Sequence, residues 1–283
     1  MENNAIPDLT ISDLLKGNLH LASPPNVYLE YKKVIDDPSK TAFDAGQVIE
    51  KDAALAAKLL KIVNSAFYGF PSQIASIARA TALVGTRELQ NLLLSALVIE
   101  RFSNLPEQTF SMHDFWARNL RCALLTREFD TQLGKKYAEV AFLCGLLHNI
   151  GQLLIYLRIP ILAREVELQL KSKVKLEVID EVLTEQRIIG FDHFQVGSEL
   201  CRLWKLPEVM VETIRLHAYP DTINPYADIA AMVRLAHYYS DVEQPFDTVI
   251  AGSLNLPAEH INLSVEKSNV EFEGIFKMFY SAK

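Results

Sequence analysis

Hydrophobic residues recur at every third or fourth position along most of this chain, which is the spacing of helices that bury one face. One run places an aspartate that can cap a helix before four apolar residues that share a helical face: Asp52, then Leu55, Leu59, Ile62 and Val63. Strand-like alternation never extends beyond a few residues. The pattern therefore predicts an all-α fold.

The same spacing predicts further helices, separated by glycine and proline. Ser76 can cap a helix that Gly85 ends, and Thr86 then starts the next one. A break is also predicted at residues 149–151. The predicted helices cover residues 23–35, 52–63, 77–84, 86–97, 113–129, 138–148, 161–171, 177–187, 192–205, 207–217 and 226–239.

The pattern is interrupted at Asn104-Leu105-Pro106-Glu107, where a subdomain boundary is expected. This predicts an N-terminal helical subdomain over residues 1–105 and a second one over residues 106–240. The acidic remainder, residues 241–283, is less regular, with a short helix predicted near Thr248–Leu254. It is expected to pack on the core or to trail from it.

Composition narrows the class of protein. Hydrophobic residues make up 49% of the 283 residues and charged residues 22%, a balance typical of a folded globular chain. The net charge of −7 argues against nucleic-acid binding, because neutralising phosphates requires an excess of Lys and Arg. The start of the chain lacks the basic and apolar regions of a signal peptide, and the longest apolar run, Leu92–Ile99, is too short to span a bilayer. A cytoplasmic protein without membrane association is expected.

The candidate chemistry lies in the second half of the chain. Four of its seven histidines lie on or beside predicted helices there: His148, His193, His217 and His237. A lone histidine on an apolar helix is more often a hydrogen-bonded core residue than a ligand. Four imidazoles from four helices could instead converge on zinc or a similar ion. No Gly-rich phosphate loop or nucleophile elbow is present.

The strongest local motif is the apolar stretch from Phe142 that ends in His148-Asn149-Ile150-Gly151. It resembles the HD superfamily of metal-dependent phosphohydrolases, in which a His-Asp pair at a helix end holds a divalent ion. Three ligand positions differ from that pattern, with Asn149 in place of the Asp, Arg118 in place of the first His, and His237 in place of the last Asp. A neutral amide contributes no charge, and a guanidinium cannot act as a ligand and repels a cation. Only His148 keeps its ligand type.

A longer resemblance covers residues 23–239, which are similar to HDOD proteins, the HD-related output domains of bacterial signalling. The first half matches in residues 23–25, 37–38, 48–52, 58–69, 74–77 and 83–85. The second half matches in Glu185, Gly190, Asp192, His193, Gly197, Leu200, Trp204, Leu206, Pro207 and His217, whereas Ala218 replaces the second member of a His-His pair. The resemblance implies an all-α fold of two helical parts, the second an HD-like bundle, with no established enzymatic activity.

Three hypotheses follow. The preferred one is a non-enzymatic signalling or scaffold module that needs no cofactor. It would act in trans on a kinase, a response regulator or a cyclic-dinucleotide enzyme, in an oligomeric state that the sequence does not indicate. The second is a diverged phosphohydrolase whose divalent metal (Zn, Fe, Ni or Mn) is held by His148, His193 and His217. The third is a sensor that binds a nucleotide or another anion through Arg118 in a relic cleft lined by Arg118, His148, Asn149, His193, His217 and His237.

Two further motifs favour structural roles. In residues 64–69, Asn64 and Ser65 are expected to end a helix and to bond to the backbone, with Phe67 and Tyr68 packed beside them. Partner binding is the second interpretation of this motif. Gly197 is expected to allow close contact between helices.

Overall fold

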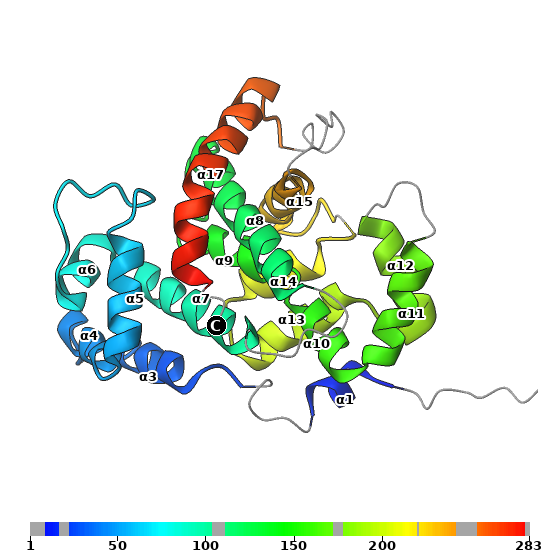
Figure 1. The fold of residues 1–283 in the computed structure, drawn as a ribbon, viewed down its shortest axis with the longest axis horizontal. Coiled ribbons are helices and arrows are strands. Elements are labelled where there is room, and N and C mark those ends of the chain that lie inside the picture. Colours follow the sequence, from blue (N-terminus) through cyan, green and yellow to red (C-terminus); the bar gives the residue numbers. More distant parts are fainter. Residues whose placement is uncertain are drawn as a thin grey trace, which may run out of the picture. The chain divides into compact units, whose positions relative to one another are not determined.

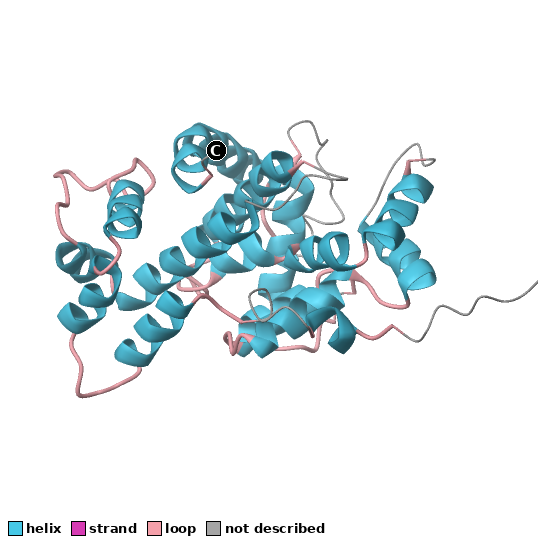
Figure 2. Ribbon diagram, turned by 60° about the horizontal axis from the view of Figure 1, so that its bottom comes forward, coloured by secondary structure: helices cyan, strands magenta, loops and turns pink. Residues whose placement is uncertain are grey.

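The structure is a computed structural model of the 283-residue chain, and it describes residues 9–16, 23–103, 111–171, 178–219, 221–241 and 254–280. These residues form helices joined by turns and loops, with no strand among them, which confirms the all-α prediction (Figure 2). The chain divides into two compact units that each combine two separate segments. The first unit holds residues 1–23 and 147–234, and the second holds residues 24–146 and 235–283.

In the second unit, helices from the N-terminal half pack with one helix from the C-terminal end. Helix α4 contacts α3 and α6, and α7 contacts α3, α5 and α8. The bounds are α3 Asn26–Ile35, α4 Ala42–Glu50, α5 Ala53–Val63, α6 Ile77–Val84, α7 Thr86–Ser103, α8 Met112–Gln132, α9 Ala141–Leu147 and α17 Ala258–Phe279. Helix α17 lies along α8 and also contacts α5 and α7 (Figure 1).

In the first unit, α10 packs on α13, and α13 packs on α14. A second group, α11 with α12, joins through α10, and the short α1 rests on α10 and α13. The bounds are α1 Ile11–Leu15, α10 Ile150–Arg158, α11 Pro160–Leu170, α12 Val178–Ile189, α13 His193–Leu203 and α14 Glu208–Arg215. Helix α15, Ala227–Ser240, begins in the first unit and ends in the second.

The predicted capping residues act as expected. The Asp52 carboxylate accepts from the amides of Ala54 and Leu55, and the Ser76 hydroxyl accepts from Arg79 N–H. Gly85 ends α6 with φ of +89°, a conformation that is strained for any residue with a side chain. The ends of α5 and α6 that these signals predicted agree with the structure to within one residue.

Two glycines allow helices of the first unit to approach closely. A Cβ atom on Gly151 would lie 1.9 Å from the carbonyl oxygen of His193 and 2.6 Å from the backbone nitrogen of Gly197. A Cβ atom on Gly197 would lie 3.3 Å from the backbone nitrogen of Gly151. The contact between α10 and α13 therefore requires Gly151, and the expected packing role of Gly197 is confirmed.

The division into units differs from the subdomains predicted at 1–105 and 106–240. The predicted boundary at residues 104–107 lies outside the described residues. Helix α8 follows that boundary but packs on α7 and α17, so it belongs with the N-terminal helices. Residues 1–23 join the first unit, where Arg158 donates hydrogen bonds to the carbonyl oxygens of Leu14 and Lys16.

The C-terminal extension, residues 241–283, contains a helix that the hydrophobic pattern did not predict. Helix α17 buries Ile261, Phe272 and Phe279 together with the small Ser264 and Ser268. Because two of its buried positions are serines, the apolar stripe is interrupted in the sequence. The short helix predicted near Thr248–Leu254 lies outside the described residues, apart from Leu254 in a turn.

The structure also accounts for the most apolar long stretch of the chain. Residues 141–158 are long and apolar enough to cross a membrane, with a mean hydropathy of 1.2. However, 78% of this stretch is buried inside the protein, as in the core helix of a globular domain.

Candidate site at the buried histidines

The HD-like motif lies at the join of two apolar helices. Helix α9 ends at Leu147, residues 148 and 149 form a turn, and α10 begins at Ile150. The side chain of His148 is fully buried, and Asn149 is 5% exposed. The side chain of Asn149 does not cap α10, and its buried Oδ1 atom accepts no hydrogen bond from the described residues. The turn thus presents one imidazole and one neutral amide.

His217 brings a second buried imidazole to this turn. It follows Leu216, the C-cap of α14, and is fully buried. Its ring centroid lies 5.1 Å from that of His148 and 4.5 Å from that of Phe194. Two of the predicted histidines, from segments about 70 residues apart, are therefore neighbours within the first unit.

His193 begins α13, where Asp192 forms a reciprocal capping box with Gln195. Its ring Nδ1 lies 2.7 Å from Glu185 Oε2, and the same oxygen accepts from the His193 backbone N–H at 2.8 Å. Both side chains are almost fully buried, with exposures of 1% and 5%. Burial alone lowers the pKa of His193, but the charge and hydrogen bond of Glu185 outweigh it and raise the pKa above 6.5.

The charge balance decides what this site can hold. A catalytic zinc usually has three protein ligands, and harder cations favour carboxylates. Among the described residues of the first unit, no Asp or Glu joins His148 and His217 in a cluster of three ligand atoms within 4.8 Å of one another. His193 does not join them in such a cluster either, and Glu185 already accepts two hydrogen bonds. Within the first unit, the described residues thus bring two neighbouring imidazoles together, one fewer than the three protein ligands of a catalytic zinc.

The remaining predicted cleft residues, Arg118 and His237, belong to the second unit. Arg118 was expected to fill the space of a lost ion, whereas its side chain is 48% exposed and its Nε lies 3.3 Å from a carboxylate oxygen of Asp241. His237 is partly buried in the last turn of α15. Their membership of the cleft stays a prediction.

The motif 64–69 has the structural role expected of its first two residues. The Asn64 amide donates to the carbonyl oxygens of Leu60 and Ile74 and accepts from the Ile74 N–H, which closes the loop over residues 64–74. The Ser65 hydroxyl donates to the carbonyl oxygen of Ile62. Phe67 and Tyr68 pack edge to face, with ring centroids 5.0 Å apart.

Sequence reasoning did not assign a role to Glu185. The residue belongs to the matched motifs of the second half, but its partner, His193, follows eight residues later on another helix. The sequence did offer a signal for this pairing: Glu185 lies on the same helical face as apolar residues that α12 buries. A carboxylate on such a face is rarely buried without a partner.

Fold and site together define an all-α protein in which an HD-like motif, His148-Asn149-Ile150-Gly151, joins two buried helices. The family model of the HDOD domain matches residues 21–220. The chain therefore belongs to the HDOD family, as the sequence motifs indicated.

Individual relatives are distant. An uncharacterised protein of Treponema pallidum (strain Nichols) is 28% identical over 235 residues, which cover 80% of this chain and 44% of that protein. This chain thus spans less than half the length of that relative. A crystal structure from Shewanella amazonensis SB2B matches with a TM-score of 0.74 and 23% identity, covering 90% of this chain and 94% of the other. An HDOD domain protein of unknown function from Geobacter sulfurreducens matches with a TM-score of 0.72 and 21% identity, and the match covers 91% of this chain and 93% of the other. At these identities the likeness shows the fold.

Proposed function

We propose that this chain is a non-enzymatic signalling or scaffold module that acts on protein partners in trans. One observation carries the proposal: within the described residues of the first unit, the buried histidine site has no carboxylate grouped with His148 and His217 to hold a cation. No Asp or Glu in the described part of that unit shares a ligand cluster with His148 and His217, and Glu185 is bonded to His193. In metal-dependent phosphate hydrolysis, the bound ion lowers the pKa of its water and so supplies the nucleophile.

Its fold relatives support a signalling context. A protein from Marinobacter aquaeolei VT8, provisionally assigned to signal transduction, matches with a TM-score of 0.69 and 19% identity. It is covered over only 58% of its length. The remainder of that chain lies outside the match. For the present chain, a kinase, a response regulator or a cyclic-dinucleotide enzyme would be a partner in trans.

The first experiment measures metal content and turnover together. Elemental analysis of the purified full chain is expected to show well below one transition-metal ion per chain, with no hydrolysis of p-nitrophenyl phosphate or its bis ester. His148→Ala should change neither result. The matched variant Asn149→Asp restores the missing acidic group, so it should bind more Zn²⁺ or Mn²⁺ than the wild type does. One tightly held ion in the wild type, with turnover that His148→Ala abolishes, would refute the proposal.

A second experiment tests the signalling role in cells. If the histidines do no chemistry, a folded His148→Ala variant should complement deletion of the gene as well as the wild type does. Thermal unfolding of the purified variant serves as the folding control. A variant that folds normally but fails to complement would show that the imidazole has a chemical role.

A diverged metal-dependent phosphohydrolase is the second candidate. The 5.1 Å spacing of the His148 and His217 rings favours it, because two neighbouring imidazoles can begin a metal site. One structural relative from Shewanella amazonensis SB2B is provisionally assigned as a phosphohydrolase. This alternative needs a further ligand from outside the first unit, and the metal analysis above distinguishes it from the preferred function.

A further inference from the structure

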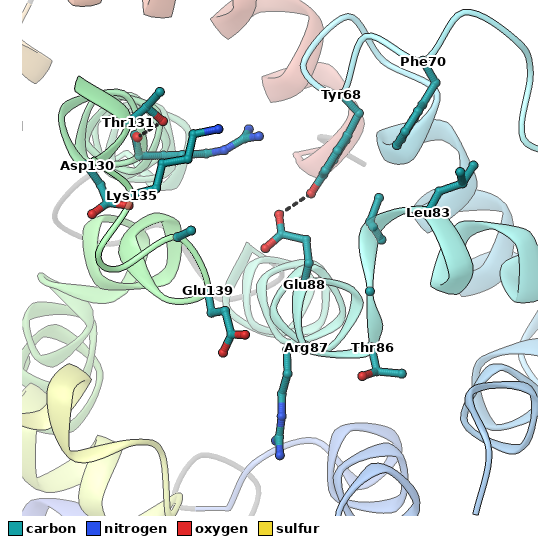
Figure 3. Close-up of a pocket in the computed structure, with 14 residues that line it drawn as sticks. Tyr68, Phe70, Leu83, Thr86, Arg87, Glu88, Asp130, Thr131, Lys135 and Glu139 are labelled. Carbon is teal, nitrogen blue, oxygen red and sulfur yellow. Dashed lines mark hydrogen bonds between the residues drawn. The ribbon is translucent and has the colours of Figure 1, made fainter. Parts of the chain in front are cut away.

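The second unit contains a cavity of about 460 Å³ that none of the histidine chemistry uses. Its walls come from three separate segments (Figure 3): the loop at Tyr68 and Phe70, the turn from Leu83 to Glu88 between α6 and α7, and the end of α8 with the loop that follows. A volume of this size lies within the usual range of small-molecule sites, which is roughly 300–1,000 Å³.

One wall of the cavity carries a half-buried acceptor. The Tyr68 hydroxyl donates to Glu88 Oε1 at 2.5 Å, and Figure 3 shows this bond at the cavity. Burial raises the pKa of the Glu88 carboxyl and, together with Glu88, that of the Tyr68 hydroxyl. The position of Tyr68 is fixed by the turn that Asn64 closes and by Gly69, which has φ of +62°. This acceptor is therefore held rigidly.

Arg127 lines the cavity as a half-buried cation held in place by aromatic rings. Its guanidinium carbon lies 3.7 Å from the ring centroid of Phe67 and 5.5 Å from that of Tyr68. Within the described residues, no carboxylate forms an ion pair with this guanidinium and no group accepts a hydrogen bond from it. The cation–π contact holds the guanidinium over the Phe67 ring while its N–H donors stay available to a carboxylate or phosphate partner.

Lys135 supplies a second cation at the cavity. Its backbone has φ of +62°, which is uncommon for a residue with a side chain, and its N–H donates to the Asp130 carbonyl oxygen at 2.7 Å. Gly134 before it has φ of +100°. The side chain is exposed, and the described part of the chain gives it no acidic partner. The turn therefore presents a lysine at the cavity in a fixed backbone conformation.

The other charged groups of the cavity are mostly engaged. Arg87 pairs with Asp36 at 3.0 Å, Asp130 accepts from the Tyr137 N–H at 2.8 Å, and Glu88 accepts from Tyr68. Glu139 is exposed and is the one lining carboxylate without such a bond among the described residues. The lining thus carries three cations and three carboxylates, and Arg127 also interacts electrostatically with Glu88. Within the described residues, Arg127 and Lys135 form no ion pair, so the capacity to bind an anionic group rests on these two side chains.

We propose that this cavity binds a small organic anion, with its phosphate or carboxylate held by Arg127 and Lys135 and a hydroxyl group bonded to Glu88. The proposal goes beyond the signalling role argued above, because it gives the second unit an input ligand. It does not depend on the histidine site.

Isothermal titration calorimetry with the full chain tests it. The probes are glucose 6-phosphate and citrate, which carry the two anionic groups on hydroxyl-bearing molecules, with glucose and putrescine as neutral and cationic controls. At least one anionic probe should bind with a stoichiometry of one, and neither control should bind. Absence of binding by both anionic probes at millimolar concentration, or a preference for putrescine, would overturn the proposal.

Variants locate the binding to the cavity. Arg127→Gln should weaken binding by about tenfold or more, since a charge-assisted pair is lost. Arg121→Gln is the matched control: Arg121 also lies on α8, with its guanidinium carbon 3.6 Å from the ring centroid of Phe272, but it does not line the cavity. Lys135→Gln should weaken binding more than the neighbouring Lys136→Gln does. Equal losses in Arg121→Gln and Arg127→Gln, with normal thermal unfolding of both, would contradict the proposed site.

Discussion

The buried pair of Glu185 and His193 offers the sharpest test of how the candidate site is built. One carboxylate oxygen of Glu185 accepts from both the backbone and the ring of His193, at 2.8 and 2.7 Å. Replacing Glu185 by alanine leaves two buried donors without this acceptor. Breaking a buried pair by removing one partner costs about 3–5 kcal/mol in the free energy of unfolding. We expect Glu185→Ala to lose this much, and Glu185→Gln, which keeps one acceptor oxygen and the shape, to lose about 1–3 kcal/mol.

The pair also predicts how stability depends on pH. Because the folded state raises the pKa of His193, it binds the proton more tightly than the unfolded chain does. The stabilisation from this residue is therefore complete below pH 6.5 and is lost as pH rises from there through the pKa of the folded state. In Glu185→Gln this component should disappear, so the difference between wild type and variant should be larger at pH 6 than at pH 9.

Urea unfolding followed by circular dichroism at these two pH values measures both effects. Glu181→Gln is the matched control, because Glu181 lies on the same helix and raises the pKa of His193 through its charge alone. It should lose far less stability than Glu185→Gln. If Glu185→Gln unfolds like the wild type at pH 6, or if the difference grows toward pH 9, the inferred pairing is refuted.

Three further changes test the packing and the cavity. Gly151→Ala should destabilise the protein by about 3 kcal/mol or more, because its Cβ would lie 1.9 Å from the His193 carbonyl oxygen. Gly274→Ala, at an open position of α17, should instead stabilise the protein by about 0.5–1 kcal/mol. Equal melting temperatures of the two variants would contradict both expectations. Asn64→Ala should cost about 2 kcal/mol through its lost backbone hydrogen bonds, with faster proteolysis of the 64–74 loop as the check. Because burial raises the pKa of Glu88, the contribution of this residue to stability should be lost as pH rises from 4.5, and urea titrations should show a smaller fall over this range in Glu88→Gln than in the wild type.

The helices that could be predicted from sequence are those with local boundary signals. The first residues of three helices have their backbone N–H groups capped by the side chain just before them, at Asp52, Ser76 and Asp192. Gly85 ends a helix through its backbone conformation. In each case the signal lies within a few residues of the helix end. Helix α10 was not predicted, because Asn149-Ile150-Gly151 marks a break and the glycine that weakens the helical pattern is required by contact with α13. That contact is tertiary and leaves no local trace.

The limits of the site prediction have the same physical origin. His148, His193 and His217 were found because the family motif marks them, and the structure places all three in the first unit. The partner of His193 was not found, since Glu185 reaches it across the turn between two helices. The cavity of the second unit combines three segments that lie up to about 70 residues apart, and none of them contains a recognised ligand-binding motif.

The two sites differ in where uncompensated charge lies. In the first unit, the imidazoles of His148 and His217 are fully buried, and the carboxylate of Glu185 is bonded to His193. In the second unit, Arg127 and Lys135 line an open cavity with their cationic groups available. Such charges favour recognition of a charged small molecule, because a paired opposite charge offsets the cost of removing the ion from water. Measured side by side, anion binding should therefore respond to Arg127→Gln and not to His148→Ala, whereas complementation by His148→Ala reports on the signalling role alone.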